Sequence, residues 1–340
     1  MKTIDDFKDY YNDRYIKTIE LYQKTHNNLL KNEKSKLKTM LFIFGLLLFV
    51  LIFPAKIYKN IFLFSLYIII ELVLLYFIYK KQILLISKTI HFDINKMVYS
   101  DMIRFITEDK NIKFDSNSRV SKKYFETSYL FNLDKYNYNG ENYTECIFNN
   151  EKVIISDFYI YNYKYHTIED YITENGKTYK RTINRKIPNK LYTGCYIELP
   201  FPQNINSYIY LVSNNFKSII KGRIDKFLIY NGERIILENL VLEEKYNVYS
   251  NDENTARYIL DLPNMEKIVT IEKFIKENKN IVYRPDHKIS VFIENFTIEN
   301  ILKQKISFEE DKISYNYLEK FFKQINNIFS SITILQDNNK

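Results

Sequence analysis

The sequence predicts an α+β protein: a two-span transmembrane helical hairpin followed by a mixed domain with an antiparallel sheet and C-terminal helices. Three observations predict this class. Two apolar runs lie close together in the N-terminal part of the chain, alternating segments with turn signals fill the middle, and helical periodicity returns toward the C-terminus.

The two apolar runs cover residues 39–55 and 61–79. The first run has no charged residue, and the second has only Glu71. A bilayer core about 30 Å thick takes roughly 20 helical residues to cross. We therefore expect both runs to span a membrane, joined by a short external turn. Buried helices of a soluble protein are the alternative, but such helices usually keep one polar face.

Lysines are denser on the outer flanks of these runs than in the turn between them. The flanks hold Lys24, Lys31, Lys34, Lys36, Lys38, Lys80, Lys81, Lys88 and Lys96, and the turn holds Lys56 and Lys59. The positive-inside rule then places both termini in the cytoplasm of a multi-pass plasma-membrane protein. The expected organisation is a cytoplasmic N-terminal helical segment (1–38), the two spans (39–80) and a cytoplasmic α+β domain (90–335).

Glu71 lies near the middle of the second run, where a carboxyl group needs a proton or a partner. One interpretation is a protonated side chain that is hydrogen-bonded to Tyr67, one turn earlier. The other is a contact with a second copy of the chain or with another membrane protein. Both interpretations stay open at this point.

Composition narrows the classes of partner. The net charge is +8, which suits the anionic surface of a lipid bilayer better than nucleic acid, so no nucleic-acid partner is expected. Cys146 and Cys195 are too far apart to suggest a metal site or a disulfide framework, and they fit a reducing compartment.

The chain between the apolar runs and residue 230 is expected to be mostly strands. A short helix is predicted over 94–107, and strands follow from about residue 111, with turns at Asn139-Gly140 and Asn175-Gly176. The alternating pattern predicts a strand over 153–166. Further strands are predicted over residues 191–199, 207–213 and 226–230.

Four tyrosines share one face of the predicted strand over 153–166, since side chains alternate between faces along a strand. They are Tyr159, Tyr161, Tyr163 and Tyr165. Such a stripe is more often one face of a packed sheet, and the alternative is a binding surface.

The C-terminal part returns to helices around one hairpin. A capping box at Ser250–Glu253 predicts a short helix, and a second helix follows Pro263. A hairpin is expected to turn at Pro285-Asp286. Another capping box, Ser307–Glu310, predicts the start of the final helix.

No pattern of catalytic or ligand-binding residues stands out. The six glycines form no phosphate-binding loop, and the four histidines belong to no metal-ligand motif. We therefore assign no catalytic, cofactor-binding or metal-binding residue and no cofactor. An enzyme is the less favoured interpretation.

One C-terminal stretch carries a resemblance to a known family. The stretch comprises Leu237–Asp252, Ala256–Leu260 and Met265-Glu266, with weaker similarity at Ser128–Phe131, Tyr138–Glu141 and Tyr192–Gly194. It resembles a bacterial family called domain of unknown function 3137. Leu242 and Tyr246 depart from the family pattern, which usually has Phe at these positions.

The resemblance implies a membrane-anchored cytoplasmic α+β protein with no assigned activity and with a LemA-type membrane protein as a partner. Its signature residues are Glu238, Ser250, Asp252, Arg257 and Tyr258. They are expected to support a strand-to-helix junction, with Arg257 directed at Glu238 or Glu243. A ligand site at the start of that helix is the alternative.

The function predicted from these features is a membrane-anchored cytoplasmic interaction or scaffold protein. Its expected partners are the lipid bilayer and either another membrane protein or a second copy of the chain. The alternative is a membrane-associated sensor or binding module for a lipid headgroup or a small ligand.

Overall fold

The computed structural model describes residues 2–52, 61–131, 133, 136–174, 177–215, 233–304, 306, 308–309 and 312–337. The chain forms two compact units. The sheet unit comprises Ser100–Asn300 and Gln324–Lys340, and the helical unit comprises Lys2–Tyr99 and Ile301–Lys323.

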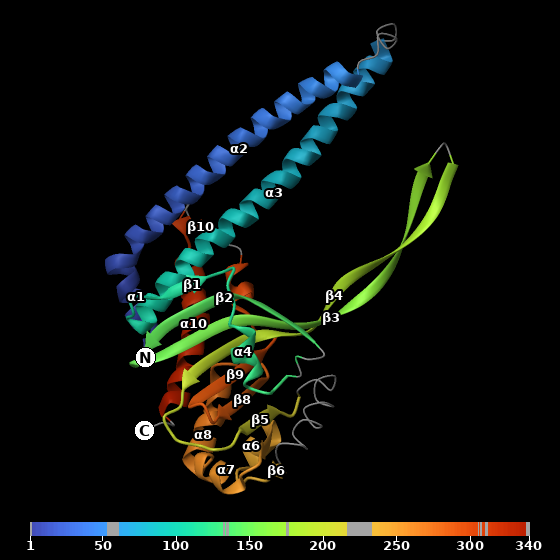
Figure 1. Cartoon of the computed structure of the whole chain (residues 1–340). Helices are drawn as coiled ribbons and strands as arrows, with labels where there is room; N and C mark the ends of the chain where they lie inside the picture. Colours follow the sequence, from blue (N-terminus) through green and yellow to red (C-terminus); the bar gives the residue numbers. More distant parts are fainter. Residues whose placement is uncertain are drawn as a thin grey trace. The chain divides into compact units, whose positions relative to one another are not determined.

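The helical unit contains two long helices (Figure 1). Its elements are α1 (Ile4–Tyr10), a π-helical turn (Tyr11–Tyr15), α2 (Ile16–Ile52), α3 (Ile61–Thr107), α9 (Ile298–Leu302), β10 (Phe308–Glu309), β11 (Lys312–Ile313) and α10 (Tyr315–Asp337). Of these, α3, α9 and α10 continue into the sheet unit. A reciprocal capping box between Thr3 and Asp6 starts α1. Phe7 then stacks on Phe322 of α10, with ring centroids 4.6 Å apart.

The predicted transmembrane hairpin is wrong. In the described part of the chain, no helix combines the length and the apolar character that a membrane crossing requires. The two runs are helical over residues 39–52 and 61–79, but each is one part of a longer helix that also carries many charged residues. The multi-pass topology and the plasma-membrane localisation depended on these spans and are corrected with them. Residues 53–60, which include the predicted external turn, lie outside the described residues.

The sheet unit is built on a nine-stranded sheet with the order β1-β2-β3-β4-β9-β8-β5-β7-β6 (Figure 1). The strands are β1 (Lys113–Asp115), β2 (Asn137–Phe148), β3 (Glu151–Glu174), β4 (Lys177–Pro200), β5 (Ile209–Ser213), β6 (Glu233–Ile235), β7 (Tyr246–Ser250), β8 (Lys279–Arg284) and β9 (Lys288–Glu294). Every neighbouring pair is antiparallel. The protein is thus a mixed α/β protein with a large antiparallel sheet.

Short helices complete the sheet unit. They are α4 (Lys122–Glu126), α6 (Leu240–Lys245), α7 (Glu253–Ile259) and α8 (Leu262–Thr270), followed by a 3-10 turn at Ile271–Lys273. The C-terminal part of α10 packs on the β2–β3 turn, where Phe329 meets Phe148 and the Gln336 amide donates to the Phe148 carbonyl.

Several predicted turns and starts differ from the structure. Asn139-Gly140 lies inside β2 and makes no turn. Gly140 is needed there because a Cβ would lie 2.4 Å from the Asp157 carbonyl oxygen of β3. The final helix begins at Tyr315, after the short β10–β11 pair, and Ser307 lies outside the described residues. The hairpin at Pro285-Asp286 is present as β8–β9.

Two further predictions fall on residues outside the described ranges. These are the turn at Asn175-Gly176 and the strand over residues 226–230.

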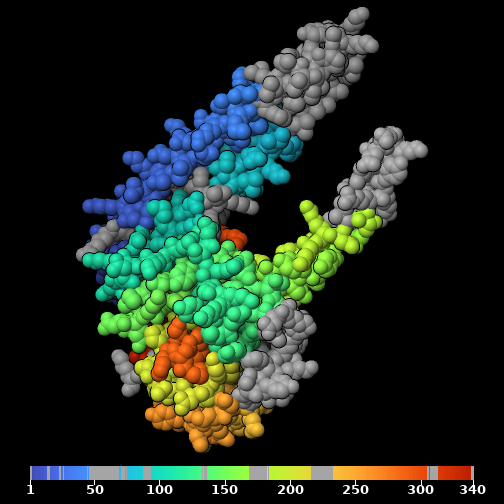
Figure 2. All heavy atoms as spheres, in the orientation of Figure 1, coloured from blue at the N-terminus to red at the C-terminus, as the bar shows by residue number. Residues whose placement is uncertain are grey.

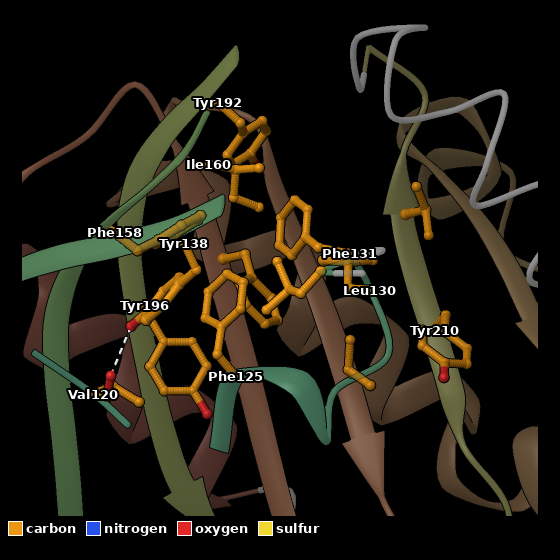
Figure 3. Packing of buried hydrophobic residues seen from close by; sticks show 14 residues of the cluster. Val120, Phe125, Leu130, Phe131, Tyr138, Phe158, Ile160, Tyr192, Tyr196 and Tyr210 are labelled. Carbon is orange, nitrogen blue, oxygen red and sulfur yellow. Dashed lines mark hydrogen bonds between the residues drawn. The ribbon is translucent and has the colours of Figure 1, made fainter. Parts of the chain in front are cut away.

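Aromatic side chains form the core on one side of the sheet (Figure 3). Phe125 of α4 lies among Phe131, Phe158, Tyr196 and Phe292, with ring centroids 4.9–5.8 Å away. Such ring pairs contribute about 0.5–1.5 kcal/mol each beyond the area they bury. The Tyr138 hydroxyl, at the edge of this cluster, donates to the Val120 carbonyl (2.8 Å). The core therefore joins α4 to strands β3, β4 and β9.

We predict that Gly194→Ala destabilises the sheet unit by at least about 1–3 kcal/mol, the usual cost of overpacking. A Cβ at this position would lie 2.1 Å from the Ile293 carbonyl oxygen, so β4 and β9 would have to separate. Urea unfolding followed by tyrosine fluorescence measures the loss. Thr167→Ala, on an exposed strand position, is the control. Equal midpoints for the two variants would contradict the close approach of the strands.

Candidate interaction surfaces

The long helices α2 and α3 leave many large apolar side chains exposed. Phe42 of α2 is 69% exposed and Phe77 of α3 is 62% exposed. The other exposed members are Met40, Ile43, Ile69, Val73, Tyr76, Ile78, Leu84 and Leu85. We call these ten side chains the arm surface. Extended exposed apolar surface of this kind marks an interaction site in folded proteins.

A groove of about 500 Å³ lies between α2 and α3 next to these side chains. Leu37, Met40 and Leu41 line it from α2, and Ile78 and Ile86 line it from α3. Its polar edge includes the ion pair between Lys36 and Glu33 (2.7 Å). Ligand pockets typically measure about 300–1,000 Å³. The groove is therefore large enough for apolar side chains of a partner or for a small apolar ligand.

Glu71 lies in α3, between exposed Ile69 and Val73. Its side chain and that of Tyr67 are outside the part of the structure that is described. The choice between a hydrogen bond to Tyr67 and an intermolecular contact therefore stays a prediction.

The four tyrosines of β3 change from partly buried to exposed along the strand. The Lys190 ammonium lies 4.2 Å from the centre of the Tyr159 ring, and Lys186 lies 4.0 Å from that of Tyr163. Tyr161 and Tyr163 meet edge to face at 5.5 Å. Tyr165 is 69% exposed. The outer part of the stripe is therefore an open surface that carries lysines.

The residues of the family signature lie where β7 meets α7, and the predicted capping box at Ser250–Glu253 is wrong because Ser250 still belongs to the strand. Ser250 ends β7, and its hydroxyl oxygen accepts from the Asp252 N–H (3.1 Å). Asp252 is the N-cap of α7 and accepts from the Thr255 N–H (3.0 Å). The Thr255 hydroxyl also donates to Asp252 (2.5 Å), and this bond, followed by the one from the Thr255 N–H, lowers the pKa of the Asp252 carboxyl. The Ser250 and Asp252 side chains thus form hydrogen bonds within the junction itself.

The partners of Arg257 differ from those predicted. Its guanidinium donates to Glu253, four residues earlier, at 2.7 and 2.9 Å, and to the Ile236 carbonyl at 3.0 Å. Glu243 instead accepts from the Leu237 N–H (2.9 Å), and Glu238 is exposed. Arg257 is closer in sequence to Glu253 than to either predicted carboxylate, and the i,i+4 geometry of a helix favours that pair.

Tyr258 of the signature is 73% exposed and is one of several exposed apolar side chains near α6 and α7. The others are Ile236, Leu240, Val241 and Leu262. No sequence motif marks these exposed side chains.

Sequence reasoning also missed a buried charge network between β4, β8 and β9. The Arg284 side chain is 1% exposed and donates to Glu198 (3.0 Å), to Ser290 (3.0 Å) and to Asp286 (2.9 Å). Glu198 also accepts from Lys288 (2.5 Å). No motif marks these residues, since they are adjacent only after the strands pair.

The network is electrically balanced and hydrogen-bonded. Two cations face two carboxylates, and the Tyr196 hydroxyl donates to Glu198 (2.6 Å). Burial, followed by the negative charge of Glu198, raises the pKa of Tyr196 well above its usual value. A paired network of this kind has the features of a structural clamp between strands.

A second buried carboxylate, Asp157 of β3, holds the start of α9. It accepts from the N–H groups of Ile298 (2.6 Å) and Glu299 (2.7 Å) and from the Asn142 amide (2.8 Å). Burial outweighs these hydrogen bonds and raises the pKa of Asp157 to about 7. The carboxyl acts as a cap for a helix that follows β9.

The described residues contain no group of three or more His, Cys, Asp or Glu side chains placed to hold a metal ion. Both cysteines are buried, and burial raises the pKa of the Cys146 thiol to about 12, which makes it a weak nucleophile at neutral pH.

Comparison with known proteins confirms the family resemblance over part of the chain. Residues 190–336 match the model of a family described as a protein of unknown function, DUF3137. A solved structure, the crystal structure of the mycobacterial trehalose monomycolate transport factor A, TtfA, aligns with 64% of this chain and 88% of its own. The identity is 10% and the TM-score 0.28, so this alignment carries no argument about fold or function. No curated protein matches the chain.

We predict that Glu198→Gln destabilises the sheet unit by about 3–5 kcal/mol, because it leaves the buried Arg284 guanidinium without the Glu198 carboxylate and also removes the partner of the half-buried Lys288. Denaturant unfolding measures the change. Glu253→Gln removes an exposed ion pair and should cost only about 0–1 kcal/mol. A loss for Glu198→Gln no larger than that of the control would refute the clamp.

We predict that the stability contributed by Asp157 falls as the pH rises from about 4 to about 7. The folded state keeps the proton up to a pKa of about 7, whereas the unfolded chain releases it near pH 4, so in this window folding binds a proton. The free energy of unfolding of Asp157→Asn lacks this dependence. The difference between parent and variant should therefore change between pH 5 and pH 7, and parallel curves would contradict the prediction.

Proposed function

We propose that the protein is an interaction or scaffold protein that binds another protein through the arm surface of α2 and α3. A second copy of the chain is the simplest partner. The observation that carries the proposal is the set of ten large apolar side chains that α2 and α3 leave exposed. Isolated exposed apolar residues need no explanation, but an extended set on two neighbouring helices does.

Energetics support a contact at this surface. Full burial of a side chain such as Phe, Leu or Ile contributes roughly 1.5–3 kcal/mol. Only part of that gain remains after the entropy cost of association. A few side chains usually contribute most of the binding energy of an interface, and aromatic residues are frequent among these anchors. Phe42 and Phe77 are the best candidates for anchors, since they are the two most exposed aromatic side chains of the arm surface.

The groove between α2 and α3 favours a second candidate function, a binding module for a small apolar ligand. Its volume of about 500 Å³ and its lining by Leu37, Met40 and Ile78 suit such a ligand. The two functions differ in what the groove holds: side chains of a protein or a separate molecule.

Photocrosslinking tests the proposal. A photoreactive phenylalanine analogue is placed in the full chain at Phe42 or at Phe77, and at Tyr124 of α4 as the control, which is 46% exposed in the sheet unit. We expect a discrete protein adduct, of a second copy or of one partner, from the two arm positions and none from Tyr124. Adducts to lipid alone, or none at any position, would contradict the proposal.

A charge substitution gives an independent check. Phe42→Glu together with Phe77→Glu should lower the mass of the complex in light scattering, while the circular dichroism spectrum of the chain stays unchanged. An apolar molecule that co-purifies with the parent chain and is absent from Met40→Glu would instead support the second candidate function.

A further inference from the structure

The outer half of the β3–β4 hairpin is a two-stranded ribbon without neighbours. β2 pairs with β3 only as far as Tyr161, and β9 pairs with β4 only from Gly194 onward. Residues 162–174 and 177–190, which we call the ribbon, pair with each other and with no other strand in the described part of the chain. Figure 1 shows the ribbon projecting beyond the rest of the sheet unit, and Figure 2 shows the atoms of its inner part in yellow-green.

Both edges of the ribbon therefore carry backbone N–H and C=O groups that no strand satisfies. An isolated two-stranded hairpin is marginally stable in water. Side chains near its base are also open: Tyr165 is 69% exposed and Ile187 is 39% exposed. Exposed strand edges are templates for a further strand, and several recognition domains bind extended peptides in this way.

The two edges differ because β4 contains a proline. Pro188 is paired with Tyr163 in the register. A proline has no N–H, and a strand accommodates it where its nitrogen faces the open edge. On the β4 side, this proline interrupts the row of donors. The β3 side contains no proline between residues 162 and 174, so it offers a continuous edge.

The register also identifies the open donors on β3. In an antiparallel pair, two residues that face each other without exchanging hydrogen bonds both direct their N–H and C=O groups outward. If Pro188 faces outward, then so do Tyr163, Tyr165 and Thr167, which alternate along β3. Their cross-strand partners are Pro188, Lys186 and Asn184.

The charge of the ribbon indicates the class of partner that it would bind. Residues 162–190 contain seven Lys and Arg against three Asp and Glu. Two copies of the ribbon would repel each other, whereas an acidic segment would be attracted. The Tyr159 and Tyr163 rings are covered by Lys190 and Lys186, which leaves less ring surface for stacking of nucleobases. A polypeptide strand would instead bind to the open N–H and C=O groups along the edge of the ribbon.

We infer that the outer edge of β3, from residue 162 to residue 174, binds an acidic extended segment of a partner protein as an added strand. Lys164, Arg185 and Lys186 then pair with its carboxylates. This site is separate from the arm surface, so it stands or falls independently of the function proposed above.

The test uses the full chain and a fluorescent peptide of alternating Glu and Val, as long as the ribbon. Fluorescence anisotropy measures binding. We expect saturable binding that weakens with added salt, and weaker binding of a peptide of alternating Lys and Val by about tenfold or more. Equal binding of the two peptides, or none, would overturn the inference.

Two matched proline variants separate the edges. Thr167→Pro removes an outward N–H from β3, and Asn184→Pro removes its cross-strand counterpart from β4. We expect Thr167→Pro to weaken peptide binding about tenfold and Asn184→Pro to leave it unchanged, while Thr167→Ala binds as the parent does.

Equal loss in both proline variants, or none in either, would overturn the assignment to the β3 edge. A parallel titration with oligothymidylate tests whether the ribbon binds single-stranded nucleic acid instead. Binding of the oligonucleotide that exceeds binding of the acidic peptide and is insensitive to Thr167→Pro would also refute the inference.

Discussion

The pairing of β4 on both of its edges is the constraint on which the sheet unit depends. Its inner part pairs with β3 on one side and with β9 on the other, and Gly194 allows the β4 and β9 backbones to approach. Any side chain at Gly194 would meet the Ile293 carbonyl within 2.1 Å. Because β4 is the link between strands β1–β3 and strands β5–β9, this one close approach positions the aromatic core, the buried charges and the base of the ribbon.

Buried polar groups reinforce that link. The Glu198–Arg284 pair connects β4 to β8, and Asp157 connects β3 to the start of α9. Each buried charge has hydrogen-bonded partners, and loss of one partner would leave the other charge buried without compensation. The proposed functions use two surfaces: the apolar arm surface of α2 and α3, and the basic ribbon.

Local patterns predicted local structure well. The alternation around Phe158 and the turn at Pro285-Asp286 appear in the structure, because each depends on residues close in sequence. The helix predicted after Ser250 is also present, but Asp252 is its N-cap. The charge network could not be predicted, since Glu198 and Arg284 meet only through strand pairing. The transmembrane prediction was wrong because it considered the hydropathy of the two apolar runs alone. The polar residues that continue the same helices lie outside those runs. Gly140 misled a turn prediction, because a close strand approach and a turn both require glycine.

β3 leaves the sheet with an open outer edge, and residue-resolved hydrogen exchange of the full chain is the most direct test of this geometry. We expect slow exchange for the inner amides of β3, such as Ile155 and Phe158, which lie between two strands. Beyond Tyr161 we expect alternation, with fast exchange at Tyr163, Tyr165 and Thr167 and slower exchange at Lys164 and His166. Uniform protection along residues 162–167, or no protection at any of them, would contradict it.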